Sequence, residues 1–264
     1  WTDNIINITT ATDSRNHNIP GDGKFDQEMF IDLELQVGRV DFSNLPSFSQ
    51  TEQELLRSYL NKNHAFRHKY FEPKEQAVVD DNFSTFNEAF AANGYRSFST
   101  FFAPENIIDA DYFTSMQNDS YLWSYGCGPG WHTSCNGIGT TSDFATDSLG
   151  SVFTMLFGSY FGDWDRTNNL LRAALASGST LTNCWGGRPN WYFHHMALGQ
   201  HIGYSSLISQ NNFTTYWGGY QKRGVHTALM GDPTLRMHVV GPASSIVLDT
   251  IGNNLRVSWS PSLD

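Results

Sequence analysis

Two apolar segments of this chain, 120–126 and 151–157, each lead into a glycine-flanked turn that carries a chemically capable residue. Cys127 follows the first segment and lies between Gly126 and Gly128. Ser159 follows the second segment, directly after Gly158. In a parallel α/β sheet, functional side chains gather at the carboxyl ends of adjacent strands. Because His132 lies shortly after Cys127 and an imidazole both accepts and donates protons near neutral pH, the layout predicts a nucleophile-and-base site.

Two pairings of these groups would be active. Cys127 could be the nucleophile with His132 as its base, because the glycine-rich segment between them permits a close approach. Ser159 could instead pair with His132, although its surroundings lack the G-x-S-x-G spacing of a nucleophile elbow. The non-catalytic interpretation is an exposed loop histidine, with Cys127 either packed in the core or paired with Cys135.

An aromatic segment at 183–200 supplies the candidate substrate-binding residues, Trp185, Trp191 and Met196. An aromatic wall of this kind can hold a peptide or a glycan. The alternative is that the same side chains cover the end of the sheet as part of the core. Adjacent histidines in this segment show no H-E-x-x-H pattern, which argues against zinc.

The segment GDGKFD at 21–26 is the candidate metal site. Asp22 and Asp26 place hard oxygen ligands around a glycine turn, which suits calcium. The complete D-x-[DN]-x-[DN]-G-x5-E loop is absent, so a solvated turn is the alternative. No motif requires another cofactor.

The composition restricts the class of protein. The chain has 264 residues, of which 39% are hydrophobic and 14% aromatic, enough for a sizeable core. Its formal charge of −10 disfavours nucleic-acid binding, because an acidic chain releases no counterions from a polyanion. Only 16% of the residues are charged, which suits an extracellular protein, and no apolar run is long enough for a membrane span. With nucleic acid and a membrane span disfavoured, the expected partner is the one that the aromatic segment suggests, a peptide or protein, or a glycan. The oligomeric state is left open.

Strand and helix patterns alternate along most of the chain. Alternation and apolar runs predict strands over 31–40, 76–80, 96–102, 120–126, 151–157, 180–185 and 234–240. Helical periodicity and capping signals predict helices over 51–68, 86–93, 104–116, 166–177 and 196–209. This order predicts an α/β fold with a mostly parallel sheet flanked by helices.

The pattern changes after Gly241 and Pro242, which mark a predicted domain boundary. Residues 1–240 form the predicted α/β domain, and residues 241–264 begin a β domain. Two short alternating segments surround a turn at Gly252, as in the first strands of an immunoglobulin-like or fibronectin-like sandwich. Two strands cannot bury a core, so we expect further strands to follow in the complete protein.

Five segments, in this order and approximate spacing, together resemble the gingipain-type cysteine peptidases. They are VGRV (37–40), YGCG (125–128), TTSDF (140–144), SYFGDW (159–164) and MGDPTLR (230–236). The resemblance covers about residues 30–264. It implies a caspase-like α/β fold followed by an immunoglobulin-like domain, and a location outside the cell or on a bacterial surface.

In that family, a His-Gly pair ends one strand and a catalytic cysteine ends the next. On this sequence the histidine position is Cys127 and the cysteine position is Ser159. The resemblance therefore implies a pseudo-peptidase with both catalytic residues replaced, acting as a structural or binding module. The alternatives are an active cysteine endopeptidase with a rearranged Cys127–His132 pair, and a carbohydrate or surface-adhesion module.

Overall fold

The structure is a computed structural model that describes residue 19 and residues 33–86, 89–186, 191–212, 227–238, 244–252 and 254–261. Its α-helices are α1 (Glu52–Arg67), α2 (Ala92–Phe98), α3 (Tyr112–Asn118), α4 (Thr141–Thr146), α5 (Leu170–Ala176) and α6 (Ile202–Gln210). Short 3-10 helices are η2 (Ser84–Phe86), η3 (Pro104–Asn106) and η4 (His194–Leu198). The first strands are β1 (Lys74–Asp81), β2 (Ile107–Asp109), β3 (Tyr121–Cys127), β4 (Gly130–Trp131), β5 (Ser134–Cys135) and β6 (Gly139–Thr140). The later strands are β7 (Ser151–Phe157), β8 (Thr182–Gly186), β9 (Thr227–Gly231), β10 (Ser244–Ile251) and β11 (Asn254–Ser260).

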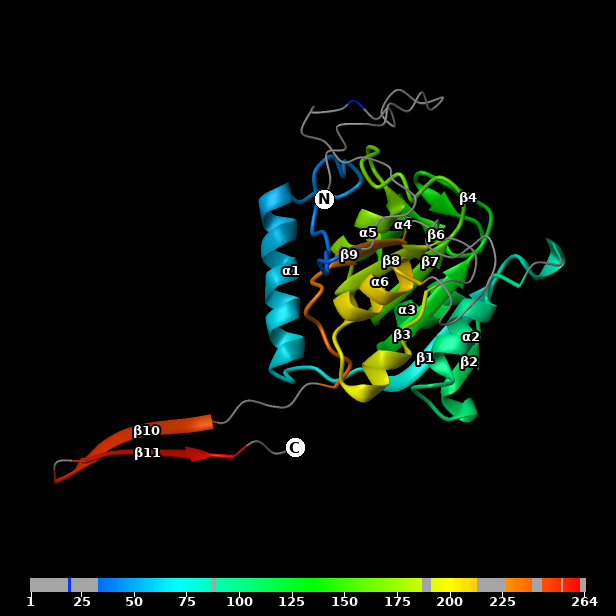
Figure 1. Cartoon of the computed structure of the whole chain (residues 1–264). Helices are drawn as coiled ribbons and strands as arrows, with labels where there is room; N and C mark the ends of the chain where they lie inside the picture. The colour runs from blue at the N-terminus through cyan, green and yellow to red at the C-terminus, as the bar shows by residue number, and fades with distance from the viewer. Residues whose placement is uncertain are drawn as a thin grey trace.

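A six-stranded sheet in the order β2-β1-β3-β7-β8-β9 forms the centre of the fold. The first five strands are parallel, and β9 is antiparallel to β8. Helices lie on both sides of this sheet, with α6 in front of it and α5 behind it in Figure 1. The predicted α/β class with a mostly parallel, helix-flanked sheet is therefore confirmed.

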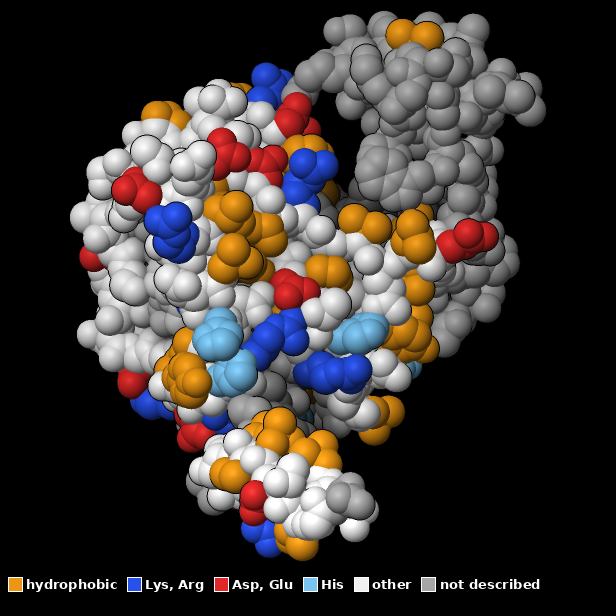
Figure 2. Space-filling model, turned by 90° about the vertical axis from the view of Figure 1, so that its left-hand side faces the viewer, with side chains coloured by type: hydrophobic (Ala, Val, Ile, Leu, Met, Phe, Trp, Pro, Cys, Tyr) orange, Lys and Arg blue, Asp and Glu red, His pale blue; other side chains and the backbone are white. Residues whose placement is uncertain are grey.

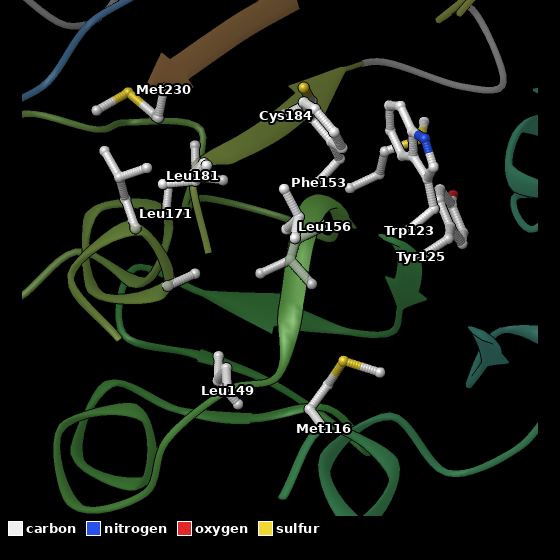
Figure 3. Packing of buried hydrophobic residues seen from close by; sticks show 14 of the residues in the cluster. Met116, Trp123, Tyr125, Leu149, Phe153, Leu156, Leu171, Leu181, Cys184 and Met230 are labelled. Atoms are coloured by element: carbon white, nitrogen blue, oxygen red, sulfur yellow. The ribbon is translucent and has the colours of Figure 1, made fainter. Parts of the chain in front are cut away.

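The central strands β3 and β7 are buried along almost their whole length, as expected for parallel strands covered on both faces. Figure 3 shows the two layers that result, with Trp123 and Phe153 on one side of β7 and Met116, Leu149 and Leu171 on the other. The rings of Trp123 and Phe153 stack with their centroids 5.0 Å apart. This aromatic packing fixes the register of the two strands whose ends carry the predicted site.

Polar side chains on the opposite face of these strands satisfy one another. The Ser124 hydroxyl donates to Thr154 (2.7 Å), and a 2.8 Å hydrogen bond joins Thr154 to the hydroxyl of Tyr112 in α3. All three side chains are fully buried. Because an unpaired buried hydroxyl would destabilise the fold, this chain of bonds anchors α3 to the sheet.

Helix α1 begins as its sequence predicts. The Thr51 hydroxyl accepts from the Glu54 amide, and the Glu54 carboxylate accepts from the Thr51 amide in return, which completes the capping box. Leu55 and Tyr59 pack into the core, whereas Leu56 and Leu60 are exposed. Figure 2 views this side of the molecule and shows histidine and basic side chains gathered on it.

The loop after β9 is fastened to α1 by a polar network. The Asp232 carboxylate accepts from Arg67 (2.8 Å) and from the amide of Asn63 (3.0 Å). The backbone N–H of Asp232 donates to the hydroxyl of Tyr59 (2.8 Å), and the other carboxylate oxygen of Asp232 accepts from the hydroxyl of Thr234 (2.7 Å). This network, which we call the β9 latch, ties the MGDPTLR segment to the first helix.

Several predicted elements are wrong in type or position. Residues 96–102 are not a strand, because α2 occupies 92–98 and packs directly on β3. A Cβ at Gly94 would lie 2.8 Å from the ring of Tyr125. The predicted helix over 86–93 is likewise replaced by η2 and the start of α2, apart from residues 87 and 88, which are not described.

Two further corrections have local causes. The predicted helix over 104–116 divides into η3, β2 and α3, because the Asp111 side chain caps the Thr114 amide (2.8 Å) and starts a new helix there. The closing strand is 227–231, and residues 234–238 of the predicted strand 234–240 are not a strand, since Thr234 is bonded to Asp232 in the turn that follows β9. Residues 239 and 240 lie outside the described part. Within the predicted strand 31–40, the described part forms only an isolated bridge at Arg39.

Strands β10 and β11 form an antiparallel hairpin in which every described residue is exposed. The strand register places Leu248 opposite Val257 on one face and Asp249 opposite Arg256 on the other. The first face is apolar, and Figure 2 shows hydrophobic side chains on the hairpin at the bottom of the view. The second face carries an Asp249–Arg256 ion pair of 3.1 Å. Among the described helices, none has the length and apolar character that a membrane span requires.

Candidate functional site

Cys127 and Ser159 lie at the carboxyl ends of neighbouring parallel strands, as the sequence predicts. Cys127, the last residue of β3, pairs with Phe157, the last residue of β7. The pairing continues past the strands, because the Gly128 amide donates to the carbonyl of Phe157 (3.1 Å). The helix expected after the second strand is α5, which begins at Leu170.

The two loops beyond these strands touch through their backbones. A Cβ on Gly158 would lie 2.5 Å from the carbonyl oxygen of Gly128. A Cβ on Gly130 would lie 2.6 Å from the carbonyl oxygen of Ser159. No side chain fits at either position without backbone movement, which explains the glycine directly before Ser159 and the one three residues after Cys127.

The Cys127 thiol is bonded to a residue of β1. It is completely buried and donates to the carboxylate of Asp81 (3.3 Å), which also accepts from the Phe83 amide (3.0 Å). Burial, and then the negative charge of Asp81, raise the pKa of Cys127 far above its ordinary value. The residue is therefore a neutral thiol at physiological pH, whereas a nucleophilic cysteine requires the thiolate.

All three cysteines are free and buried, so the Cys127–Cys135 pairing that the sequence left open as an alternative is not formed. The Cys135 thiol donates instead to the carbonyl of Gly128 (3.5 Å), and burial raises the pKa of Cys135 to about 12. Burial also raises the pKa of Cys184 well above its usual value. The interpretation of these residues as small apolar core residues is the one that the structure favours.

Ser159 is exposed and begins a strained turn. The Phe161 amide donates to the Ser159 carbonyl (2.9 Å), and Tyr160 between them has a φ of +68°. A γ-turn with positive φ at a tyrosine is rare and energetically costly. Within the part of the chain that the structure describes, no hydrogen bond links the Ser159 hydroxyl to a base.

His132 belongs to the two-residue turn that joins β4 to β5. Its Nδ1 lies 3.1 Å from the carbonyl oxygen of Tyr160. Because a carbonyl only accepts, this bond requires the proton on Nδ1 and leaves Nε2 as the acceptor of the neutral ring. The structure thus brings His132 to the loop after β7, while the Cys127 thiol is bonded to Asp81 on β1.

An exposed aromatic cluster lies at the same strand ends, and sequence reasoning did not find it. The Trp131 ring is 4.7 Å from the ring of Tyr160 and 4.8 Å from that of His132, measured between centroids. Trp131 is 53% exposed and Tyr160 is 55% exposed. We call these three residues the aromatic platform. The signal in the sequence was an aromatic residue after each glycine turn, but only the strand pairing shows that the two turns meet.

Side chains from the surrounding segments hold the loop after β7 in place. The Trp185 indole donates to the Gly158 carbonyl (2.8 Å), and the Asn169 side chain donates to two carbonyl groups of the same loop. The Arg39 guanidinium lies 3.8 Å from the centre of the Trp164 ring, a cation–π contact. These contacts fix the loop that presents Tyr160.

The predicted substrate-binding residues lie mainly in the interior. Trp191 is 1% exposed and stacks on Phe193, and Met196 is fully buried. A ligand-binding role for these two would require the core to open. Trp185 is half-buried against Gly162, where a Cβ would lie 2.8 Å from its ring. Here Trp185 supports the loop after β7.

The predicted calcium ligands Asp22 and Asp26 lie outside the described residues. Among the residues that are described, no group of three or more histidine, cysteine, aspartate or glutamate side chains could hold a metal ion. Calcium at 21–26 therefore stays a prediction. It requires that a chelator lower the melting temperature and that added calcium restore it.

Comparisons with protein-family models, with curated proteins and with solved structures give no match to this chain.

Proposed function

We propose that this chain is a gingipain-like, caspase-fold domain whose catalytic positions are inactive, and that it serves outside the cell as a binding or structural module. The proposal rests on the five resembling segments and on what occupies the two strand ends. The environment of the Cys127 thiol carries most of the argument.

A catalytic thiol needs a positive or proton-accepting neighbour. The Cys127 side chain has the opposite surroundings, because it is buried against the Asp81 carboxylate. Forming the thiolate there would place two negative charges together in a dry environment. This position therefore supplies neither a nucleophile nor the imidazole that the resembled family has.

Ser159 retains exposure but has no activating partner among the described residues. A serine hydroxyl is a weak nucleophile unless a base takes its proton. The imidazole of His132 is directed by its Nδ1 bond to the Tyr160 carbonyl. Its free acceptor, Nε2, favours one alternative, a residual hydrolase in which His132 acts on a thiol or hydroxyl brought to it by a loop movement.

The two functions are separated by a peptidase assay on the complete chain with fluorogenic casein. We expect no turnover above that of a heat-denatured sample, for the unmodified protein and for Ser159→Cys alone. The double variant Cys127→His with Ser159→Cys recreates the family's pair and is the informative gain-of-function test. Cleavage by the unmodified protein that Cys127→Ala or His132→Ala abolishes would overturn the proposal in favour of the rearranged endopeptidase.

The hairpin β10–β11 fits the proposed extracellular architecture as the first two strands of an immunoglobulin-like or fibronectin-like sandwich. Its support is the apolar face that carries Leu248 and Val257, whereas the other face combines the Asp249–Arg256 pair with Val247 and Ile251. In a sandwich, the apolar face of one sheet packs on a second sheet.

A further inference from the structure

We propose that the aromatic platform is a binding site for neutral, β-linked oligosaccharides. This inference rests on the proposed function and gives the binding module its ligand class. The platform consists of Trp131, His132 and Tyr160, and the exposed hydroxyl of Ser159 lies beside it in the chain.

The exposure of the rings is the first argument. Large aromatic side chains on the surface carry much of the energy at recognition sites. Trp131 and Tyr160 come from different loops, yet their rings are in contact and each keeps more than half of its surface in solvent. Aromatic side chains that belonged to the core, or that packed between two crossing segments, would be covered.

The rigidity of the platform is the second argument. Tyr160 is held in a positive-φ turn, and its carbonyl accepts both from His132 and from the Asp163 amide (3.0 Å). Gly130 and Gly158 bring the two loops into backbone contact. A site fixed before binding loses little entropy when its ligand arrives. The cost of the strained turn is explained if the turn serves to present the Tyr160 ring.

The shape and polarity favour a sugar over a peptide. A peptide strand would need a free sheet edge, but β3 and β7 are each flanked by neighbours on both sides. A hollow of about 270 Å³, lined by Phe66, Phe71 and Leu122, lies at the amino ends of β1 and β3. The platform lies at the opposite, carboxyl ends of the strands, so this hollow is not part of it. A pyranose with equatorial substituents has a flat face of C–H bonds that stacks on an aromatic ring, while its hydroxyls reach polar groups at the rim.

The rim of the platform supplies such groups. Nε2 of His132 is the acceptor of the neutral ring, and the Ser159 hydroxyl can both donate and accept. The same loop continues with Asp163, Asp165 and Arg166, of which Asp163 and Arg166 pair at 3.6 Å. The side chains of the platform itself carry no formal charge when the His132 ring is neutral, which suits a neutral ligand.

The test is isothermal titration of the complete chain with cellohexaose and with chitohexaose. We expect saturable binding of at least one of them. Trp131→Ala and Tyr160→Ala should each weaken it by about tenfold or more, as truncation of a central aromatic contact does. Trp131→Phe, which keeps a stacking ring, should restore part of the affinity.

The matched control is Trp259→Ala, because Trp259 on the hairpin is 59% exposed, close to the value for Trp131. This variant should bind as the unmodified protein does. Absence of binding to both oligosaccharides would overturn the inference, as would binding that Trp131→Ala leaves unchanged. Binding of a casein peptide mixture that depends on Trp131, without sugar binding, would assign the platform to peptides instead. None of these results bears on the peptidase assay, so the two proposals fail separately.

Discussion

The β9 latch and the ends of β3 and β7 both contain segments on which the proposed family resemblance rests, but their polar groups are used differently. In the latch, the Asp232 carboxylate is bonded to Arg67, Asn63 and Thr234. At the strand ends, the Cys127 thiol is turned toward a carboxylate, and Ser159 is exposed.

The difference separates scaffold from chemistry. The latch pairs each charge with its complement, which is what a stable fold requires. The strand ends retain the backbone geometry that would present reacting groups, with glycines where no side chain fits, but the groups themselves are unsuited to nucleophilic catalysis. Changes in the latch should therefore affect stability, and changes at Ser159 should affect almost nothing that can be measured as activity or stability.

The largest effect is expected for Asp232→Ala. It leaves Arg67 and Asn63 without their shared acceptor and should reduce the free energy of unfolding by about 2–3 kcal/mol. Urea denaturation followed by circular dichroism measures this loss. The control is Asp249→Ala on the hairpin, whose exposed pair with Arg256 should contribute less than about 1 kcal/mol. Equal losses in both variants would contradict the latch.

A smaller loss is expected for Gly158→Ala at the strand ends. The new Cβ would meet the Gly128 carbonyl, and relief of that overlap should cost about 1–3 kcal/mol in the same denaturation experiment. Gly199→Ala is the comparison, since its site is open but its φ is +83°. That variant should lose about 1 kcal/mol from backbone strain alone. A Gly158→Ala protein as stable as the unmodified one would show that the two loops are not packed together.

The pH dependence of stability distinguishes the two regions by sign. Burial raises the pKa of Asp232, but its hydrogen bonds to Thr234, Arg67 and Asn63 outweigh burial and lower that pKa to about 2. The stabilisation is therefore complete above the ordinary pKa near 3.8 and is lost as the pH falls toward 2. Asp232→Asn should remove about 1–2 kcal/mol of this acid-sensitive stability, reduced because the carboxylate is partly exposed.

Asp80, near the strand ends, should behave in the opposite way. Burial raises the pKa of Asp80, so its contribution weakens as the pH rises above 3.8. Asp80→Asn should therefore reduce the loss of stability that occurs as the pH rises above 3.8. Asp232→Asn should instead reduce the loss that occurs as the pH falls from 3.8 toward 2. Melting temperatures measured between pH 2 and 6 test both variants. The same sign for both would show that the two carboxylates do not differ as described.

The smallest effect is expected for Ser159→Cys. The side chain is exposed, so the free energy of unfolding should change by less than about 0.5 kcal/mol. The new thiol should give no peptidase turnover, because no imidazole lies at the Cys127 position. Turnover by this single variant would show that His132 serves as a base for position 159.

The sequence predicted the parts of the fold whose signal is local. The capping box at Thr51 and the buried runs of β3 and β7 are of this kind, and the order of these strands followed from glycine turns that end apolar segments. The strand predicted over 96–102 was wrong because Gly94 lets the chain pack as a helix against Tyr125, a residue distant in sequence. Propensity is overridden there by tertiary packing.

The sequence predicted where the candidate site lies but not which side chains contact one another there. Adjacent strand ends placed Cys127 and Ser159 correctly, whereas the direction of the thiol depended on Asp81, a residue of another strand. The pairing of Trp131 with Tyr160 likewise requires the register of β3 and β7. Side-chain orientation between strands is not encoded in local patterns, which is why the platform was missed.

The most direct test of the account is the reactivity of Cys127 in the folded protein. Iodoacetamide labelling of the complete chain, followed by peptide mass spectrometry, gives the rate for each cysteine between pH 6 and 9. The account predicts that Cys127 reacts far more slowly than free cysteine throughout this range, and at the rate of a free thiol only after unfolding in urea. Labelling of Cys127 in the native protein faster than free cysteine at pH 7 would show an activated thiolate and contradict the central claim that this strand end carries no nucleophile.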